Sequence, residues 1–204
     1  MRYLLICILI SVKAYSQCWE SVSVSDNHVL AIASDGSLWS WGSNNYAKLG
    51  FNGIPVNEPT HVGNEYDWTL VSAGAYHSFA IKSDNQLYGW GGNYYGQIGS
   101  GNGLDIVPFY DLVNNFNWQT IKSGNEFSIA IKSDGTLWTW GLNSAGQLGD
   151  GTILNKSLPT QLGNNQDWQT IAIGYTKGYG IKANGTLWTW GQIHLLKLVL
   201  RITG

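Results

Sequence analysis

Residues 130–152 read AIKSDGTLWTWGLNSAGQLGDGT, and this stretch decides the fold because its pattern recurs along the chain. Trp140 within it follows Trp118 by 22 residues, and the same pair of tryptophans appears three more times. The first members of the four pairs are 49, 50 and 50 residues apart: Trp19, Trp68, Trp118 and Trp168. All 11 tryptophans of the chain occupy one of three positions in this repeat. A fixed period of about 50 residues is typical of solenoids and propellers.

Each unit of the repeat reads as short strands separated by turn residues. The first strand begins at the leading tryptophan, the second alternates as in residues 77–82, and the third alternates bulky and polar residues as in 137–140. Two-residue type I′ hairpin turns are predicted between the second and third strands, at 35–36, 84–85, 134–135 and 184–185. Residues after Pro59, Pro108 and Pro159 suit a short edge strand. Four strands in 50 residues predict a propeller blade.

The repeat predicts an all-β fold of four-stranded antiparallel blades over residues 17–191. Three units are complete, at 19–67, 68–117 and 118–167, and a partial one occupies 168–191. A ring of seven blades at this period needs roughly 350 residues, so we expect an incomplete, open propeller of about three and a half blades. Exposed sheet faces at the two ends of such an arc favour self-association.

Composition narrows the function classes. The 204 residues carry 11 Lys and Arg against 13 Asp and Glu, a net charge of −2, so no basic surface for nucleic acid is expected. The first of the two cysteines, Cys7, lies in an apolar leader, which leaves Cys18 alone. A single thiol forms neither an internal disulfide nor a metal site, and we expect it packed or half-exposed.

Residues 1–16 are predicted to be a signal peptide. Met1 and Arg2 give a charged start, residues 3–12 form an apolar run, and Ala14-Tyr15-Ser16 is a small-x-small cleavage signal. The run is too short to span a bilayer, and a buried first strand is the alternative interpretation. We therefore expect an exported protein without a membrane span, secreted or held in a periplasm or at a cell surface.

The tail at 192–204 departs from the repeat. After Gly191 the pattern demands the turn residues found at 43–50, but the sequence is largely apolar. Codons can be chosen for residues 192–199 from those that the genetic code permits. When these codons are translated one base out of register, they give a peptide similar to residues 43–50. We therefore hypothesise a frameshift just after Gly191; the alternative is a genuine terminal strand.

No enzyme chemistry is predicted. His28 and His77 occupy the repeat position of Phe127 and Lys177, which indicates a structural role. Asp35, Asp84 and Asp134 are turn residues, and the glycines at 146, 149 and 151 lack the Lys-Ser/Thr ending and the following helix of a phosphate loop. No catalytic residue, cofactor or metal is expected.

The predicted binding surface is the set of short loops between the first and second strands. Equivalent loops of radially repeated blades lie on one rim, and their sequences differ at 26–27, 75–76, 125–126 and 175–176. Tyr76 and Tyr175 are the predicted binding anchors, with Asp26 and Glu126 beside them. These loops predict a non-catalytic interaction module that binds a protein or a glycan.

Residues 130–152 resemble the repeat of the regulator of chromosome condensation family, and the resemblance extends over the repeats up to Gly191. Kelch propellers have a similar period, but they require a Gly-Gly doublet in each unit, which only Gly91-Gly92 offers. The resemblance implies a β-propeller, typically of seven blades. The founding member is a nuclear, chromatin-bound exchange factor for a small GTPase, and bacterial relatives are exported, one of them a secreted β-lactamase inhibitor. Guanine-nucleotide exchange and enzyme inhibition are therefore the alternative functions. The predicted leader and the net acidity disfavour the nuclear role.

Overall fold

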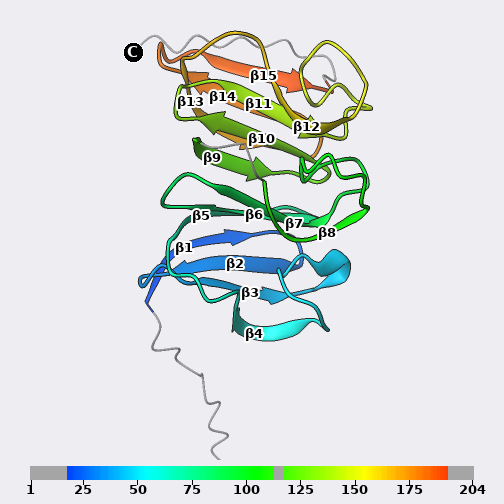
Figure 1. Ribbon diagram of the computed structural model, residues 1–204. Coiled ribbons are helices and arrows are strands. Elements are labelled where there is room, and N and C mark those ends of the chain that lie inside the picture. The colour runs from blue at the N-terminus through cyan, green and yellow to red at the C-terminus, as the bar shows by residue number, and fades with distance from the viewer. Residues whose placement is uncertain (1–17, 113–116, 193–204) are drawn as a thin grey trace, which may run out of the picture.

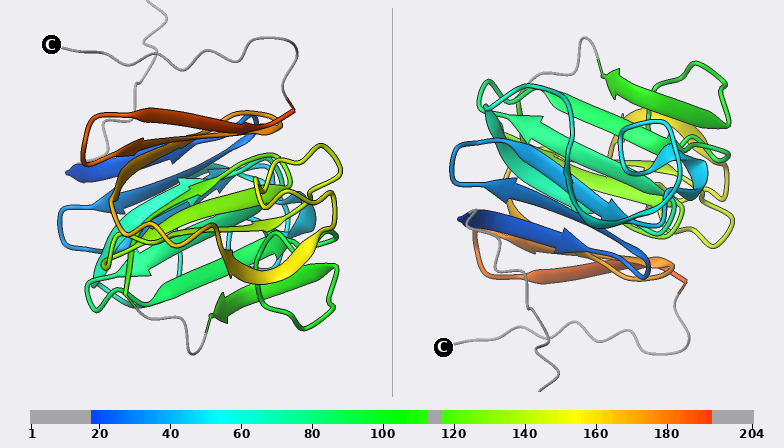
Figure 2. Two further views of the ribbon diagram at one scale, coloured as in Figure 1. Left: turned by 90° about the horizontal axis from the view of Figure 1, so that it is seen from above. Right: turned by 90° about the horizontal axis from the view of Figure 1, so that it is seen from below.

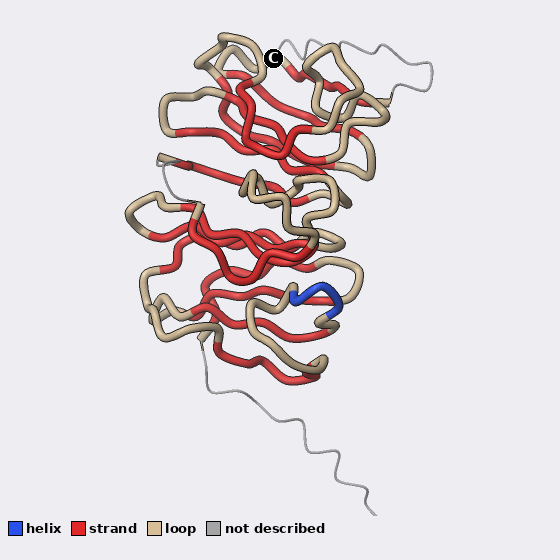
Figure 3. Tube along the Cα trace, turned by 45° about the vertical axis from the view of Figure 1, so that its right-hand side comes forward, coloured by secondary structure: helices blue, strands red, loops and turns tan. Residues whose placement is uncertain are grey.

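The computed structural model describes residues 18–112 and 117–192, and nearly all their regular structure is strand (Figure 3). The one helical element among them is the short 3-10 turn η1 (Asn45–Ala47). The predicted leader, and all of the tail except Gln192, lie outside the described residues. Cys18 is an exposed free thiol. No helix of the described part is long and apolar enough to cross a membrane.

The described part of the chain contains fifteen strands, which repeat one pattern. The first strand of each unit begins at its leading tryptophan: β1 (Trp19–Val24), β5 (Trp68–Ala73), β9 (Trp118–Ser123) and β13 (Trp168–Ile173). The second strands are β2 (His28–Ala33), β6 (His77–Lys82), β10 (Phe127–Lys132) and β14 (Lys177–Lys182). The third strands are β3 (Leu38–Gly42), β7 (Leu87–Gly92), β11 (Leu137–Gly141) and β15 (Leu187–Gly191). Fourth strands complete three of the units: β4 (Val56–His61), β8 (Ile106–Asp111) and β12 (Lys156–Gln161).

The strands form three four-stranded antiparallel sheets and one three-stranded sheet, each in sequence order. We call these blades 1 to 4. Figure 1 shows them stacked in succession, with β1–β4 at the bottom and β13–β15 at the top. In both views of Figure 2, β8 lies at the border of the molecule away from β1. The prediction of an open, partial propeller is confirmed.

Apolar residues fill the space between neighbouring blades. One buried cluster combines Leu30 and Leu38 of blade 1 with Trp68 and Trp90 of blade 2. Two further clusters join blades 2 and 3 and blades 3 and 4 in the same way. The aromatic residues at the repeat positions therefore belong mainly to the core, and the burial of such rings is the main stabilising term.

The hairpin turns differ from the predicted type I′. That turn needs positive φ at both central residues, but in the first unit only Gly36 has it, with φ 81°. The Gly36 amide donates to the Ala33 carbonyl, and the Asp35 carboxylate accepts hydrogen bonds from the Ser37 amide and hydroxyl. This is a type I turn followed by a left-handed residue, which the aspartate side chain stabilises. Asn85 takes the left-handed position in blade 2, with φ 66°.

Polar side chains join blade 1 to blade 2 through a buried set of hydrogen bonds that we call the clasp. Ser78 Oγ and Trp90 Nε1 both donate to the Lys48 carbonyl, each over 2.8 Å. The Ser78 hydroxyl proton is thereby used, so this oxygen accepts the Nε2 proton of His28 at 2.8 Å. The Ala73 amide also donates to Ser23 Oγ across the two innermost strands.

The same clasp joins blade 2 to blade 3. Ser128 and Trp140 donate to the Gln97 carbonyl, and His77 donates to Ser128. The serine, the tryptophan and the histidine Nε2 of each clasp are therefore paired across the junction between two repeats, whereas His77 Nδ1 has no partner among the described residues.

Candidate functional site

The loops between first and second strands lie on one face of the arc, which we call the loop face. It is the right-hand side of Figure 1, where η1 also lies. The structure places all four predicted residues on it, but in two separate concavities. Tyr76 and Glu126 line one cleft, whereas Asp26 and Tyr175 line another.

The second concavity lies where the innermost strands of all four blades converge. It has a volume of about 270 Å³ and is lined by the ends of β5, β9 and β13 and by the loops that follow β1 and these three strands. Its walls are mostly small residues, among them Ala75 and Gly124. The Tyr175 ring, at one side of this concavity, is exposed. The site is wide and shallow, with few groups that could fix the orientation of a ligand.

The larger concavity, which we call the tyrosine cleft, has a volume of about 390 Å³. It lies over blade 2, with walls from the loops of blades 1 and 3. Nine residues line it: Tyr46, Tyr76, Gly92, Tyr94, Tyr95, Gln97, Asp105, Ile106 and Glu126. Four tyrosines in one cleft give rigid, amphipathic contact area at low cost in side-chain entropy.

Two perpendicular ring pairs shape the cleft. Tyr46 and Tyr76 have centroids 5.5 Å apart at 88°, and Tyr94 and Tyr95 have centroids 5.1 Å apart at 82°. Edge-to-face contacts of this kind hold each ring in one orientation. Tyr46 is 49 % exposed and Tyr94 is 71 % exposed, so rings are available for a ligand.

Gly92 keeps the floor of the cleft open. A Cβ at this position would lie 3.3 Å from the Tyr76 Cβ and 3.6 Å from the Tyr46 Cβ. The equivalent residues are Ser43 in blade 1 and Leu142 in blade 3. The glycine of blade 2 therefore leaves the space that a larger side chain occupies in the neighbouring repeats.

Two carboxylates give the cleft a negative character. Glu126 and Asp105 line it, and neither side chain has a hydrogen-bond or ion-pair partner among the described residues. Burial raises the pKa of Glu126. Lys48 is buried and does not line the cleft, and its Nζ donates to Asn27 Oδ1 and to the Ala75 carbonyl. Burial lowers the pKa of this lysine, while the Asp26 carboxylate acts in the opposite direction.

The sequence alone did not indicate Tyr46, Tyr94 and Tyr95 as site residues. They follow the third strands, in a segment that the repeat pattern identifies only as turn residues. A usable signal was nevertheless present, because only blade 2 combines the Gly91-Gly92 doublet with two adjacent tyrosines.

The histidines have structural positions. Desolvation by burial lowers the pKa of both His28 and His77 from 6.5 to about 3. Both are therefore neutral at physiological pH, and their Nε2 protons serve the clasp. No group of three potential metal-ligating side chains occurs within residues 18–112 and 117–192.

Two family models match the chain, and both describe the Regulator of chromosome condensation (RCC1) repeat. One matches residues 19–47, 68–97 and 118–147, and the other matches 35–81, 84–131 and 134–177. Together they cover residues 19–177 without a gap. A search of the curated proteins finds no match.

Solved structures show the same fold. Prp20p from Saccharomyces cerevisiae, studied for its binding to Gsp1p and histones, aligns with 22 % identity and a TM-score of 0.77 over 88 % of this chain and 47 % of its own. Human WBSCR16 aligns with 22 % identity and a TM-score of 0.77 over 91 % of this chain and 53 % of its own. The ectodomain of the Physcomitrella patens receptor kinase CR4 aligns with 16 % identity and a TM-score of 0.54 over 91 % and 44 %. The chain spans about half the length of these structures.

Proposed function

Because the chain belongs to the regulator of chromosome condensation (RCC1) repeat family, we propose that it is a non-catalytic interaction module that binds a protein partner at its tyrosine cleft. The observation that carries this proposal is the convergence of four tyrosines and two unpartnered carboxylates from three blades. Tyrosine-rich surfaces with a few polar groups are typical of protein recognition.

A glycan is the second candidate ligand. The exposed Tyr94 ring supports it, because sugars can stack on an accessible aromatic face while carboxylates accept their hydroxyl hydrogen bonds. Guanine-nucleotide exchange and enzyme inhibition are narrower forms of the first candidate. Each requires a particular protein partner, a small GTPase or an enzyme, at the same kind of surface.

Export is part of the proposal and rests on the sequence of residues 1–16. A charged start, a ten-residue apolar run and a small-x-small site together favour a cleaved leader. Expression of the full chain in its native cell, followed by N-terminal sequencing of the extracellular fraction, tests it. A mature N-terminus at Gln17 supports export, and an intact Met1 in the cytosol opposes it.

Self-association is proposed because both end sheets of the described arc expose apolar side chains. Val22 and Val24 are exposed on β1, and Leu187 and Trp188 on β15. Apolar faces of this kind are usually covered, and a second copy of the chain is one way to cover them. Sedimentation velocity distinguishes a monomer from a larger assembly.

The binding proposal is tested by affinity capture from the medium in which the protein is found, followed by mass spectrometry. Gly92→Leu, which introduces the residue that blade 3 carries, and Tyr76→Ala should each abolish capture of the specific partner. Ile153→Ala is the control, since this exposed apolar residue lies outside the cleft. Capture that survives both cleft variants contradicts the proposal. Capture that is lost after enzymatic deglycosylation of the medium identifies a glycan ligand instead.

A further inference from the structure

A lysine lies against two aromatic rings in each of blades 2, 3 and 4. The distances from Nζ to the six ring centroids run from 4.3 to 5.2 Å, within the range of a cation–π interaction. The three groups are Lys82 with Trp68 and Tyr88, Lys132 with Trp118 and Trp138, and Lys182 with Trp168 and Trp188. We call each group a lysine cage.

The cages occupy one position in the repeat. The lysine ends the second strand and pairs with the leading tryptophan of the first, as Lys132 does with Trp118. The other ring comes from the start of the third strand. In blade 1 the residue paired with Trp19 is Ala33. Blade 1 therefore has the two rings, Trp19 and Trp39, without the lysine.

The ring pair of blade 1 keeps the geometry of the occupied cages. Trp19 and Trp39 have centroids 5.8 Å apart and an interplanar angle of 85°, against 6.0 Å and 78° for Trp118 and Trp138. Trp39 Nε1 donates to Ser37 Oγ over 2.8 Å, which fixes the ring. In blade 3, Trp138 donates to Thr136 over the same distance. Loss of the lysine has therefore not changed the ring arrangement.

An acidic group is also retained beside the rings. Thr136 hydrogen-bonds to the Asp134 carboxylate, and this carboxylate and Lys132 attract each other electrostatically. The equivalent Ser37 hydrogen-bonds to Asp35 over 2.5 Å. Hydrogen bonds from Ser37 lower the pKa of Asp35, so this residue remains a carboxylate. Blade 1 therefore has a carboxylate, that of Asp35, at the position where Asp134 lies near the lysine of blade 3.

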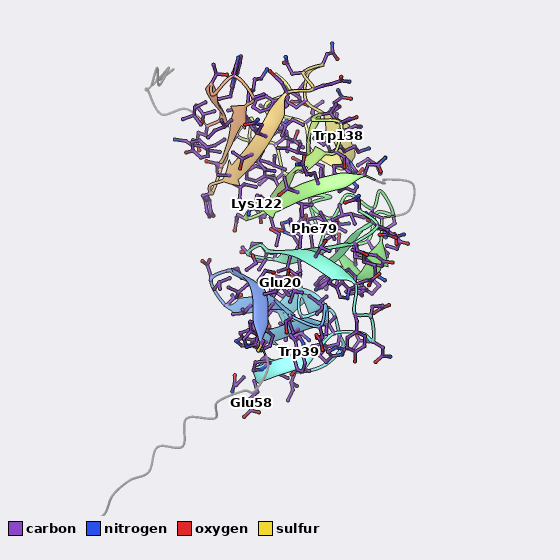
Figure 4. The ribbon with its side chains drawn as sticks, turned by 90° about the vertical axis from the view of Figure 1, so that its left-hand side faces the viewer. Glu20, Trp39, Glu58, Phe79, Lys122 and Trp138 are labelled. Atoms are coloured by element: carbon purple, nitrogen blue, oxygen red, sulfur yellow. The ribbon has the colours of Figure 1, made fainter. Side chains whose placement is uncertain are left out.

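The rings of blade 1 are accessible. Trp19 is 38 % exposed, whereas the leading tryptophans of the other three blades are 7 % exposed or less. His61 lies 5.0 Å from Trp39, and Tyr66 lies 5.7 Å from His61, so the aromatic wall continues outward. Within the described residues no lysine or arginine lies over Trp19 or Trp39. The rings are on the face opposite the tyrosine cleft, and Figure 4 looks onto that face, with Trp39 and Trp138 labelled.

One further difference bears on the kind of cation. In blades 2 and 4 the lysine also forms an ion pair, with Asp67 at 3.4 Å and Asp167 at 3.2 Å. The equivalent residue of blade 1 is Cys18, which supplies no charge. In blade 3 the equivalent residue is Asn117, and Lys132 occupies its cage without this ion pair, so the aspartate stabilises a strongly hydrated primary ammonium but is not required for it. A methylated ammonium sheds water more easily and gains most from the aromatic faces.

From these observations we propose that Trp19 and Trp39 form a binding site for the methylated ammonium group of an external ligand, in the place where the other blades hold their own lysine. The site is independent of the tyrosine cleft. Methyl-lysine of a protein and the choline group of a small molecule or lipid share this chemistry, so the experiment includes both sources.

The test uses nuclear magnetic resonance of the indole Nε1–H groups in the full chain, with tetramethylammonium, choline, and a short peptide carrying lysine or trimethyl-lysine. Tetramethylammonium should shift the Trp19 and Trp39 resonances at millimolar concentration and leave those of Trp118 and Trp138 unchanged. Of the other probes, the trimethyl-lysine peptide should bind at least several-fold more tightly than its unmethylated form. A preference for this peptide over choline indicates a protein source, and the reverse preference indicates a choline source.

Ala33→Lys is the decisive variant because it restores the cage of blades 2 to 4 and should abolish the shifts without loss of thermal stability. Ser34→Lys is its matched control, since it adds the same charge at an exposed neighbouring position, and it should keep the shifts. Trp39→Tyr, which copies Tyr88 of blade 2, should retain binding with a folded chain. Absence of any shift, or shifts that persist in Ala33→Lys, would overturn the proposal.

Discussion

The junction between blades 2 and 3 and the junction between blades 3 and 4 join equivalent strands of the repeat. They differ in their side-chain hydrogen bonds, which are present at the first junction and missing at the second. At the first, His77, Ser128 and Trp140 complete the clasp on the Gln97 carbonyl. At the second, the histidine is replaced by Phe127 and the serine by Gly178, and Trp190 Nε1 has no partner in the described part of the chain. Among the described residues, apolar packing and one backbone hydrogen bond, from the Trp168 amide to the Gly135 carbonyl, connect blade 4 to blade 3.

The innermost strands repeat the contrast. The Ser123 amide donates to Ser72 Oγ over 2.8 Å, whereas the residue equivalent to Ser72 in blade 3 is Lys122, which offers no acceptor. Hydrophobic pattern therefore suffices to build a blade, while the clasp adds strength to the contact between blades. In a repeat protein the stability of each junction contributes separately to the whole.

The largest expected difference lies in the response to acid, which should weaken the two junctions that contain a histidine, His28 between blades 1 and 2 and His77 between blades 2 and 3, and not the junction between blades 3 and 4. The folded pKa of His28 and His77 lies below the unfolded value, so the unfolded chain binds more protons between pH 6.5 and about 3. Their contribution is complete above pH 6.5 and is lost as the pH falls toward 3. At pH 5, each histidine should lower the free energy of unfolding by about 2 kcal/mol relative to its value at pH 7.5. Urea unfolding at pH 7.5, 6 and 5 measures the loss, and the double variant His28→Gln/His77→Gln should flatten the profile. A wild-type midpoint that does not change would refute the role of the histidines.

A matched pair of tryptophan variants gives the next largest effect. Trp140→Phe removes buried volume and a hydrogen bond and should cost about 3 kcal/mol. Trp190→Phe removes similar volume but no hydrogen bond, and should cost about 1 kcal/mol. Urea unfolding at pH 7.5 with a common slope measures both. Equal costs would show that the clasp contributes nothing beyond packing.

An attempt to install the missing serine sharpens the comparison. Gly178→Ser should destabilise the chain by about 2 kcal/mol instead of joining blades 3 and 4. A Cβ at Gly178 would lie 2.2 to 2.5 Å from three atoms of the Trp190 ring. Thermal unfolding compares this variant with Gly185→Ser, where a Cβ would meet no atom within 4 Å but the positive φ of 77° adds strain. A gain in stability at Gly178 would mean that the ring moves and the clasp forms.

The smallest effect concerns the carbonyl-bearing residue of the first junction. Lys48→Gln copies Gln97 and Gln147 of the following blades and removes a buried ammonium, so stability at pH 7.5 should change by less than about 1 kcal/mol. The charge of Lys48 contributes to the lowered pKa of His28, so that pKa should rise in the variant. Titration followed by the imidazole resonances measures it, and an unchanged pKa of His28 would assign the shift to burial alone.

The blades could be predicted from sequence because their tryptophans and turn residues are fixed by local geometry. The hairpin type could not, since the choice between one and two left-handed residues depends on the hydrogen bond from Ser37 to Asp35. The sequence of the loops indicated Tyr76 and Glu126, which the structure brings together in one cleft, and their role in binding stays a prediction. It could not separate Tyr175 from them, nor add Tyr94 and Tyr95, because the convergence of loops from different blades depends on the angle between sheets.

The clasp also has a consequence for how the chain acquires its structure during synthesis. Its side-chain pairs span about 50 residues, from His28 to Ser78 and from His77 to Ser128. Blades 2 and 3 can therefore each dock as soon as they leave the ribosome, on a neighbour that is already complete. Folding during synthesis would then add one blade at a time from the N-terminus, and the clasp would join blades 2 and 3 to the blade made before each of them.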